Sequence, residues 1–106
     1  MYTKTNIIKL TKDEIKSFGL EKTLIDITFK PEKTSLTEGY ASYTPKIVSG
    51  VQEGHILNFD LKMINEQKLS DDYLRGLISH ELYHLVLNEI KYIFSGEKYF
   101  YSSYTF

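Results

Sequence analysis

The chain has 106 residues, of which 42% are hydrophobic and 25% are charged, and its net charge is −1. This length suffices for one hydrophobic core, so we expect a single domain over residues 1–106. The near-zero charge and the scattered lysines argue against a sequence-independent grip on nucleic acid or on an anionic membrane. Apolar runs are too short for a transmembrane helix, and the absence of cysteine excludes disulfides and thiolate metal ligands. The first ten residues lack the apolar stretch of a signal peptide, so we expect a cytoplasmic protein.

A short N-terminal helix is predicted from Lys12 to Phe18. Thr11 followed by Glu14 has the capping-box pattern, in which each side chain bonds the backbone N–H of the other residue. Gly19 stands where the helix would end, because glycine readily adopts the left-handed conformation that follows many last turns.

Three strands are predicted next, from a change to a period of two. The first runs from Thr23 to Lys30 and ends at Pro31, with its apolar positions at Ile25, Ile27 and Phe29. The second runs from Gly39 to Thr44 and is closed by Pro45. The third begins at His55, which shares the apolar face, and its other apolar positions are Leu57, Phe59, Leu61 and Met63.

A long helix is predicted between Ser70, as N-cap, and Gly96, as terminator. Asp71 and Asp72 fall in its first turn, where the helix dipole favours negative charge. Apolar residues then recur at helical spacing, at Leu74, Leu77, Ile78, Leu82, Leu85, Val86, Ile90 and Ile93. The elements together predict an α+β fold: a short N-terminal helix, a small, mostly antiparallel three-stranded sheet, this long helix on one sheet face, and a short C-terminal segment.

The middle of the long helix carries the pattern His-Glu-x-x-His. His80 and His84 are four positions apart, so they lie on one helix face and can aim two imidazole nitrogens at a single zinc ion. Gly76, one turn earlier, leaves that face open. Glu81 is turned about 100° from His80, where a carboxylate can act as general base toward a water activated by the metal. Two alternatives stay open: a chance match of the pattern, and two partly buried histidines satisfied by hydrogen bonds.

A catalytic zinc site usually needs a third protein ligand. Glu97 is the favoured candidate, because it follows Gly96, where the chain can turn back toward the histidines. His55 is the competitor, although a histidine at the rim of the core is its more ordinary role. Glu89 lies about 180° around the helix from His80, so we expect it to be a solvated charge. Asp60 falls on the opposite strand face.

The segment "GHILNFDLKMINEQKLSDDYLRGLISHELYHLVL" resembles the core of the SprT-like metallopeptidases, in which a strand with an "I-x-L-N" type element leads into a His-Glu-x-x-His helix. Ile56, Leu57 and Asn58 fit that element. With "EGYASYTP", which is similar to the short strand before it, the resemblance covers about residues 38 to 100. It implies a zincin-like domain with His80 and His84 as zinc ligands.

The departure from the SprT-like pattern lies after the helix, where those proteins place a third histidine and this chain has Glu97. A glutamate as third ligand, about a hundred residues and a cytoplasmic setting resemble the minigluzincins, which are reduced to the catalytic core. That resemblance implies latency, with the C-terminal segment or self-association blocking the cleft. It also leaves a DNA-repair role without support.

The last eight residues read "YFYSSYTF", an unusually aromatic end. This tail either enters the cleft of its own or a neighbouring molecule and keeps substrate out, or covers the core as a final packed segment. Peptide hydrolysis also needs a donor to the developing oxyanion, and the hydroxyl of Tyr92 or Tyr99 is a candidate.

The sequence therefore predicts a zinc metallopeptidase of peptide or protein substrates, with Zn²⁺ held by His80, His84 and Glu97 and with Glu81 as general base. The alternative is a zincin-like binding or regulatory module that holds zinc without turnover and self-associates through the tail. A third possibility is a closed structural zinc site that has both Glu97 and His55 as ligands.

Overall fold

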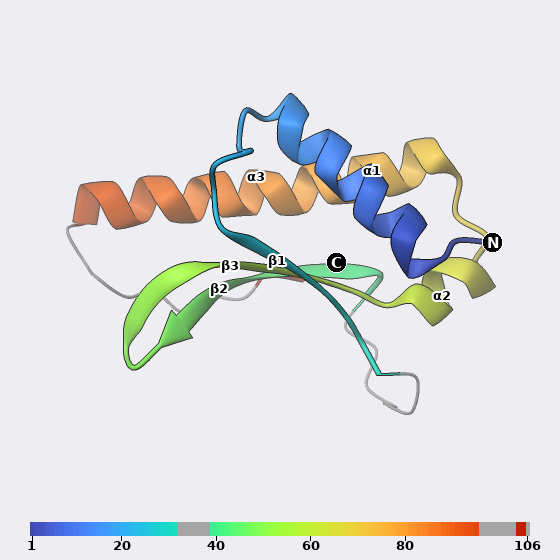
Figure 1. The fold of residues 1–106 in the computed structure, drawn as a ribbon, viewed down its shortest axis with the longest axis horizontal. Coiled ribbons are helices and arrows are strands. Elements are labelled where there is room, and N and C mark those ends of the chain that lie inside the picture. Colours follow the sequence, from blue (N-terminus) through green and yellow to red (C-terminus); the bar gives the residue numbers. More distant parts are fainter. Residues whose placement is uncertain (32–38, 96–103, 106) are drawn as a thin grey trace.

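The computed structural model describes residues 1–31, 39–95 and 104–105, with backbone only beyond residue 91. It is an α+β fold, as predicted. The elements in chain order are α1 (Lys4–Ser17), β1 (Ile25–Phe29), β2 (Ala41–Val48), β3 (Val51–Phe59), α2 (Leu61–Glu66), α3 (Asp71–Ser95) and β4 (Tyr104–Thr105). The strand order is β1-β3-β2-β4. Helices α1 and α3 lie above this sheet, and α2 lies at its end (Figure 1).

Helix α1 begins eight residues earlier than the predicted Lys12. Its N-cap is Thr3, whose hydroxyl accepts from the Asn6 backbone N–H, while the Asn6 side chain accepts from the Thr3 N–H. The capping-box prediction at Thr11 is wrong, because Thr11 is buried inside the helix, where its hydroxyl donates to a backbone carbonyl one turn back. The predicted end is confirmed, with Gly19 at a φ of 70° directly after the last turn.

The sheet is built around β3, which pairs in parallel with β1 and antiparallel with β2. Strands β2 and β3 form a hairpin through Ser49 and Gly50, both of which have positive φ, as a two-residue type I′ turn requires. At the other side of β2, two residues of β4 pair antiparallel with Ser42 and Tyr43. The three predicted strands are present, and the end of the chain adds this short fourth one.

Strand β2 continues through Pro45, which was predicted to close it. Pro45 lies opposite His55, and the backbone N–H of His55 donates to the Leu24 carbonyl on the β1 side. In this antiparallel pair the backbone groups of both residues therefore point outward. The backbone nitrogen of Pro45 thus faces away from β3. Because proline has no N–H to donate, this orientation means that the ladder between β2 and β3 loses no hydrogen bond.

Strand β3 ends at Phe59, earlier than the predicted strand, which ran on to Met63. Asp60 terminates it by capping helix α2, with its Oδ1 accepting from the Met63 backbone N–H at 3.0 Å. Leu61 and Ile64, which are three positions apart, lie on one face of this short helix and pack on the core. The aspartate cap favours the helix over a continued strand.

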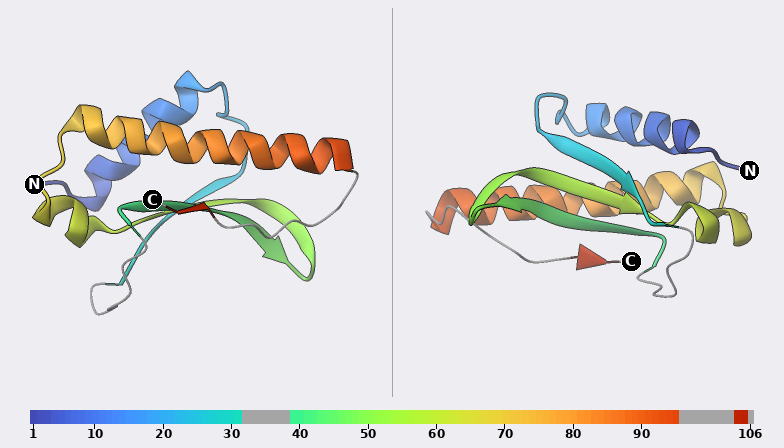
Figure 2. Two further views of the ribbon diagram at one scale, coloured as in Figure 1. Left: turned by 180° about the vertical axis from the view of Figure 1, so that it is seen from behind. Right: turned by 60° about the horizontal axis from the view of Figure 1, so that its bottom comes forward.

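Helices α1 and α3 lie on the same side of the sheet, and α3 runs over β2 (Figure 2). The core between these layers is aliphatic and aromatic, with His55 and Glu81 as buried ionisable groups. Its fully buried members include Ile7, Tyr43, Leu57, Phe59, Ile64, Leu74, Ile78, Leu82 and Leu85. The helical positions predicted from Leu74 to Leu85 are thereby confirmed as core. No helix in the described ranges is long and apolar enough to cross a membrane.

Gly54 lets the start of β1 approach β3 closely. A Cβ at this position would lie 2.9 Å from the Leu24 carbonyl oxygen, which is backbone and cannot simply rotate away. We expect Gly54→Ala to lower the free energy of unfolding by about 1–3 kcal/mol, the usual cost of forced packing. Urea denaturation measures this effect, and an unchanged midpoint would show that the two strands separate at little cost. Gly50→Ala is the comparison variant. Its added Cβ meets no atom within 4 Å, so any loss of stability in this variant comes from the backbone φ of 80° and not from a steric clash.

Candidate metal centre

The helix that carries the motif begins as predicted, with Ser70 Oγ accepting from the Tyr73 backbone N–H at 3.2 Å. On this helix His80 and His84 lie one turn apart, with their ring centroids 4.5 Å apart and their planes at 69°. Their Nε2 atoms are 2.8 Å apart. Both rings therefore turn the same nitrogen toward one point on the flank of α3.

The two histidines have a donor set that fits a divalent cation. At 2.8 Å one Nε2–H donates to the other Nε2, which requires at least one neutral ring. Burial lowers the pKa of His84, and the neighbouring His80 lowers it further. The neutral form, with a nitrogen lone pair available, is the one that ligates metals. A cation between these two nitrogens would take the place of the proton that they share.

Glu81 points from the same helix into the core. Its side chain is fully buried, and neither carboxyl oxygen makes a hydrogen bond of ordinary geometry with a described residue. Burial raises the pKa of Glu81 to about 8, while the backbone N–H of Tyr43 on β2 has a smaller, lowering effect. A buried carboxyl group with so weak a partner is costly. Glu81 lies between the two histidines in sequence, and its side chain faces Tyr43 on β2.

His55 and Glu89 form a separate cluster. The Tyr43 hydroxyl lies 2.7 Å from His55 Nδ1, and His55 Nε2 lies 2.6 Å from Glu89 Oε1. With His55 neutral, the tyrosine donates to Nδ1 and Nε2–H donates to the glutamate. Both nitrogens of the competing third ligand are thus engaged. Glu89, predicted to be a solvated charge, has a side chain that is 43% exposed, and its carboxylate also bonds the buried ring of His55, on the helix flank opposite His80.

Glu97, the favoured third ligand, lies outside the described residues, as do Tyr99 and the side chain of Tyr92. Within residues 1–31 and 39–91, no group of three histidine, aspartate or glutamate side chains could hold a metal ion. Asp60 serves as the cap of α2 and pairs with Lys30 at 3.9 Å.

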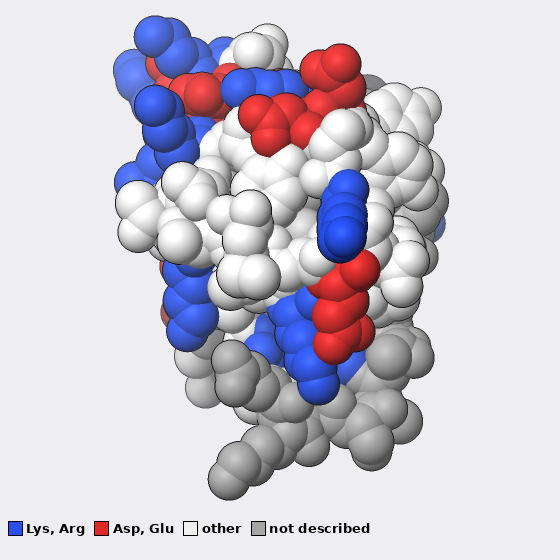
Figure 3. Space-filling model, turned by 90° about the vertical axis from the view of Figure 1, so that its right-hand side faces the viewer, with Lys and Arg blue, Asp and Glu red and all other residues white. Residues whose placement is uncertain are grey.

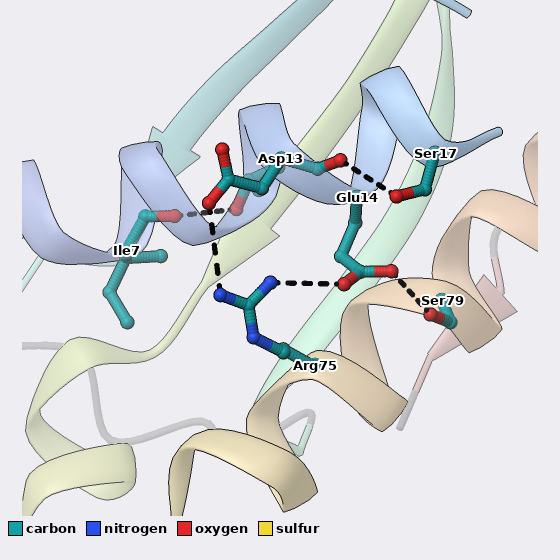
Figure 4. Close-up of polar contacts among 7 residues, drawn as sticks. Ile7, Asp13, Glu14, Ser17, Arg75 and Ser79 are labelled. Atoms are coloured by element: carbon teal, nitrogen blue, oxygen red, sulfur yellow. Dashed lines mark hydrogen bonds and ion pairs between the residues drawn. The ribbon is translucent and has the colours of Figure 1, made fainter. Parts of the chain in front are cut away.

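The position of α3 against α1 depends on a polar contact next to the motif (Figure 4). Arg75 donates to Glu14 Oε1 at 3.1 Å and lies 3.7 Å from Asp13, while the Ser79 hydroxyl donates to Glu14 Oε2 at 3.0 Å. Glu14 is largely buried between the helices. Ser79 precedes His80, so this contact sets the rotation of α3 at the turn where the histidine pair begins.

Sequence reasoning missed two features beside the site. The first is Tyr43, whose backbone faces Glu81 and whose side chain bonds His55. The second is β4, since Tyr104 and Thr105 pair with Tyr43 and Ser42, and β4 also contacts α3. The alternation in Ala41, Ser42 and Tyr43 could have placed Tyr43 on the core face, but no local signal predicts a pairing between residues sixty positions apart.

No protein-family model, no curated protein and no solved structure matches the chain. Its candidate site therefore has to be judged from its own residues.

Gly76, one turn before His80, is exposed and open to solvent. A Cβ added there would meet no atom within 4 Å. We expect Gly76→Ala to raise the free energy of unfolding by about 0.5–1 kcal/mol, because alanine loses less backbone entropy in a helix interior. Thermal denaturation tests this expectation, and a lower midpoint would reveal a contact at this position in solution. Zinc content should be unchanged in this variant.

Proposed function

We propose that the chain is a zinc-dependent metallopeptidase, with zinc held by His80, His84 and Glu97 and with Glu81 as the general base. The observation that supports this most is the convergence of the two Nε2 atoms, 2.8 Å apart, on a helix that also carries a buried carboxyl group at the position after His80. If the two histidines were only core residues satisfied by hydrogen bonds, the convergence of their nitrogens would be explained. The burial of the Glu81 carboxyl group would not. A glutamate in this place is costly to the fold, which is the common mark of a residue kept for function.

The chemistry that we assign to the residues is acid–base transfer at Glu81. Zinc, when bound, would supply Lewis-acid activation of a peptide carbonyl and of the attacking water. Glu81 would accept the proton of that water and deliver it to the leaving amine. Burial raises the pKa of Glu81 to about 8 in the metal-free protein, and a bound zinc ion would lower this pKa again, because a nearby cation favours the carboxylate form that acts as the base. The cytoplasmic setting belongs to the same proposal.

A peptide substrate fits best along the outer edge of β2. Ser42 and Tyr43 already pair there with β4, and the backbone of Tyr43 also faces Glu81. An extended peptide added to this edge would use the same antiparallel ladder. The end of the chain, or that of a second copy, would then compete with substrate and keep the enzyme latent.

A chain that ends at Lys98 tests this latency. We expect it to cleave casein at least several-fold faster than the full chain, because the edge of β2 becomes available to substrate. Equal activity of the two chains, with equal thermal stability, would exclude a blocking role for the tail. A chain extended by one flexible glycine–serine segment after Phe106 controls for the altered C-terminus.

The function itself is tested by two measurements on tag-free protein that has been offered excess zinc and dialysed. We expect about one zinc per chain and turnover of casein that is abolished by a chelator and restored by zinc. Protein that returns without zinc would end the proposal. Zinc at one per chain without turnover, even after removal of the tail, would favour the silent binding module instead.

A further inference from the structure

A cavity of about 630 Å³ opens at the end of the molecule where α1 begins and β1 ends. Phe29 and Leu61 contribute apolar surface to it, from β1 and α2. Its volume lies in the range of small-molecule sites, which are mostly apolar with a few polar groups that fix the ligand. None of its residues belongs to the proposed metal centre.

Lys30 is the unusual member of this cavity. Its side chain is only 13% exposed, its Nζ atom is buried, and no hydrogen-bond acceptor serves it among the described residues. The ion pair with Asp60 is long, at 3.9 Å, and the other oxygen of Asp60 is used to cap α2. An ammonium group has three N–H donors, and burying them unbonded is costly. An anion that enters the cavity would satisfy them once the Nζ atom, which has almost no exposed surface in this conformation, turns toward it.

The remaining charges of the cavity are mainly positive. Lys4 lies over the ring of Phe29, 5.5 Å from its centroid, and Lys62 lies 3.8 Å from Glu66, the one acidic residue of the lining. Among the described residues, these three lysines face two carboxylates, that of Glu66 and that of Asp60, which pairs with Lys30. Lysines and acidic residues border an uncharged surface at this end of the molecule (Figure 3). A ligand with an apolar body and a single anionic group is complementary to this arrangement.

We propose that this cavity binds a small organic acid, with its apolar body against Phe29 and Leu61 and its carboxylate on Lys30. Lys4 and Lys62 add to the positive potential at the mouth. A neutral molecule of the same shape would leave the Lys30 ammonium as it is and would gain only the apolar contact. The site is independent of the proposed peptidase activity.

The experiment uses the full chain labelled with ¹⁵N and two matched probes, 4-phenylbutyrate and its neutral amide, 4-phenylbutyramide. We expect the acid to shift the amide resonances of Phe29, Lys30 and the α2 residues, and to bind at least about tenfold more tightly than the amide. Equal affinity of the two probes, or acid-induced shifts confined to other parts of the chain, would overturn the proposal.

Lys30→Met keeps the volume of the side chain and removes its charge. We expect it to weaken binding of 4-phenylbutyrate at least tenfold. Its thermal midpoint should fall, because Asp60 stays largely buried without its ion-pair partner, so binding is compared at a temperature at which both proteins are folded. Lys16→Met, on the exposed last turn of α1, is the matched control and should bind as wild type. Unchanged binding in a folded Lys30→Met protein would refute the site. Should that variant fail to fold, Lys4→Gln is expected to weaken binding several-fold, and unchanged binding in Lys4→Gln would also count against it.

Discussion

Replacing Glu81 by Gln is expected to abolish peptide hydrolysis while making the metal-free protein more stable. The amide has the same shape but cannot take a proton, so turnover should fall by about 10²–10⁴-fold, the usual contribution of a general base. Zinc content should stay at the wild-type level, because Glu81 is not a ligand. The opposite directions of the two effects distinguish this variant from one that merely disrupts the fold.

The gain in stability should depend on pH in a defined way. Burial raises the folded-state pKa of Glu81 to about 8, from an ordinary value of 4.5. The folded protein therefore holds a proton that the unfolded chain releases, and wild-type stability falls as pH rises from about 4.5 to about 8. The Gln variant lacks this loss. Its advantage should be near zero below pH 4.5, grow through that window, and level off above pH 8 at about 5 kcal/mol.

Urea denaturation of chelator-treated protein at a series of pH values measures this difference. Glu53→Gln, which changes an exposed carboxylate on β3, provides the control and should show no such growth with pH. A Glu81→Gln variant that is no more stable than wild type at pH 8 would mean that the carboxylate has a partner in solution. One that still hydrolyses casein would remove the general-base role.

Replacing His84 by Ala is expected to remove zinc and activity together. The remaining imidazole of His80 and one carboxylate cannot hold the ion against dialysis, and we expect affinity to fall by more than the roughly 10–100-fold that even outer-shell changes cost. His80→Ala should behave in the same way. Zinc content per chain and casein turnover are the two measurements.

Tyr83→Ala is the matched control for this experiment, because Tyr83 is on the same helix and 56% exposed. It should retain both zinc and activity. Comparison of Glu97→Gln with His55→Gln then identifies the third ligand. Because both nitrogens of His55 are engaged, we expect only Glu97→Gln to lose zinc. Full zinc binding in the His84 variant would contradict the site itself.

Local patterns were sufficient for most of the elements. The period of two located β1, and the helical spacing of leucines after Ser70 located α3 and its buried face. Both patterns depend only on neighbours along the chain and on which side is solvated, so they can be read without the fold. His-Glu-x-x-His is of the same kind, since four residues on a helix always make one turn.

Contacts between distant segments required the tertiary structure. The role of Glu89 depends on His55, thirty-four residues away, and the burial of Glu81 depends on β2 lying under α3. The charged state of a carboxyl group is decided by the solvent and by dipoles around it, which belong to several elements at once. The tertiary structure also explains Pro45. Only the order of the strands in the sheet shows that the backbone nitrogen of Pro45 faces away from β3, where a residue without an N–H loses no hydrogen bond to that strand.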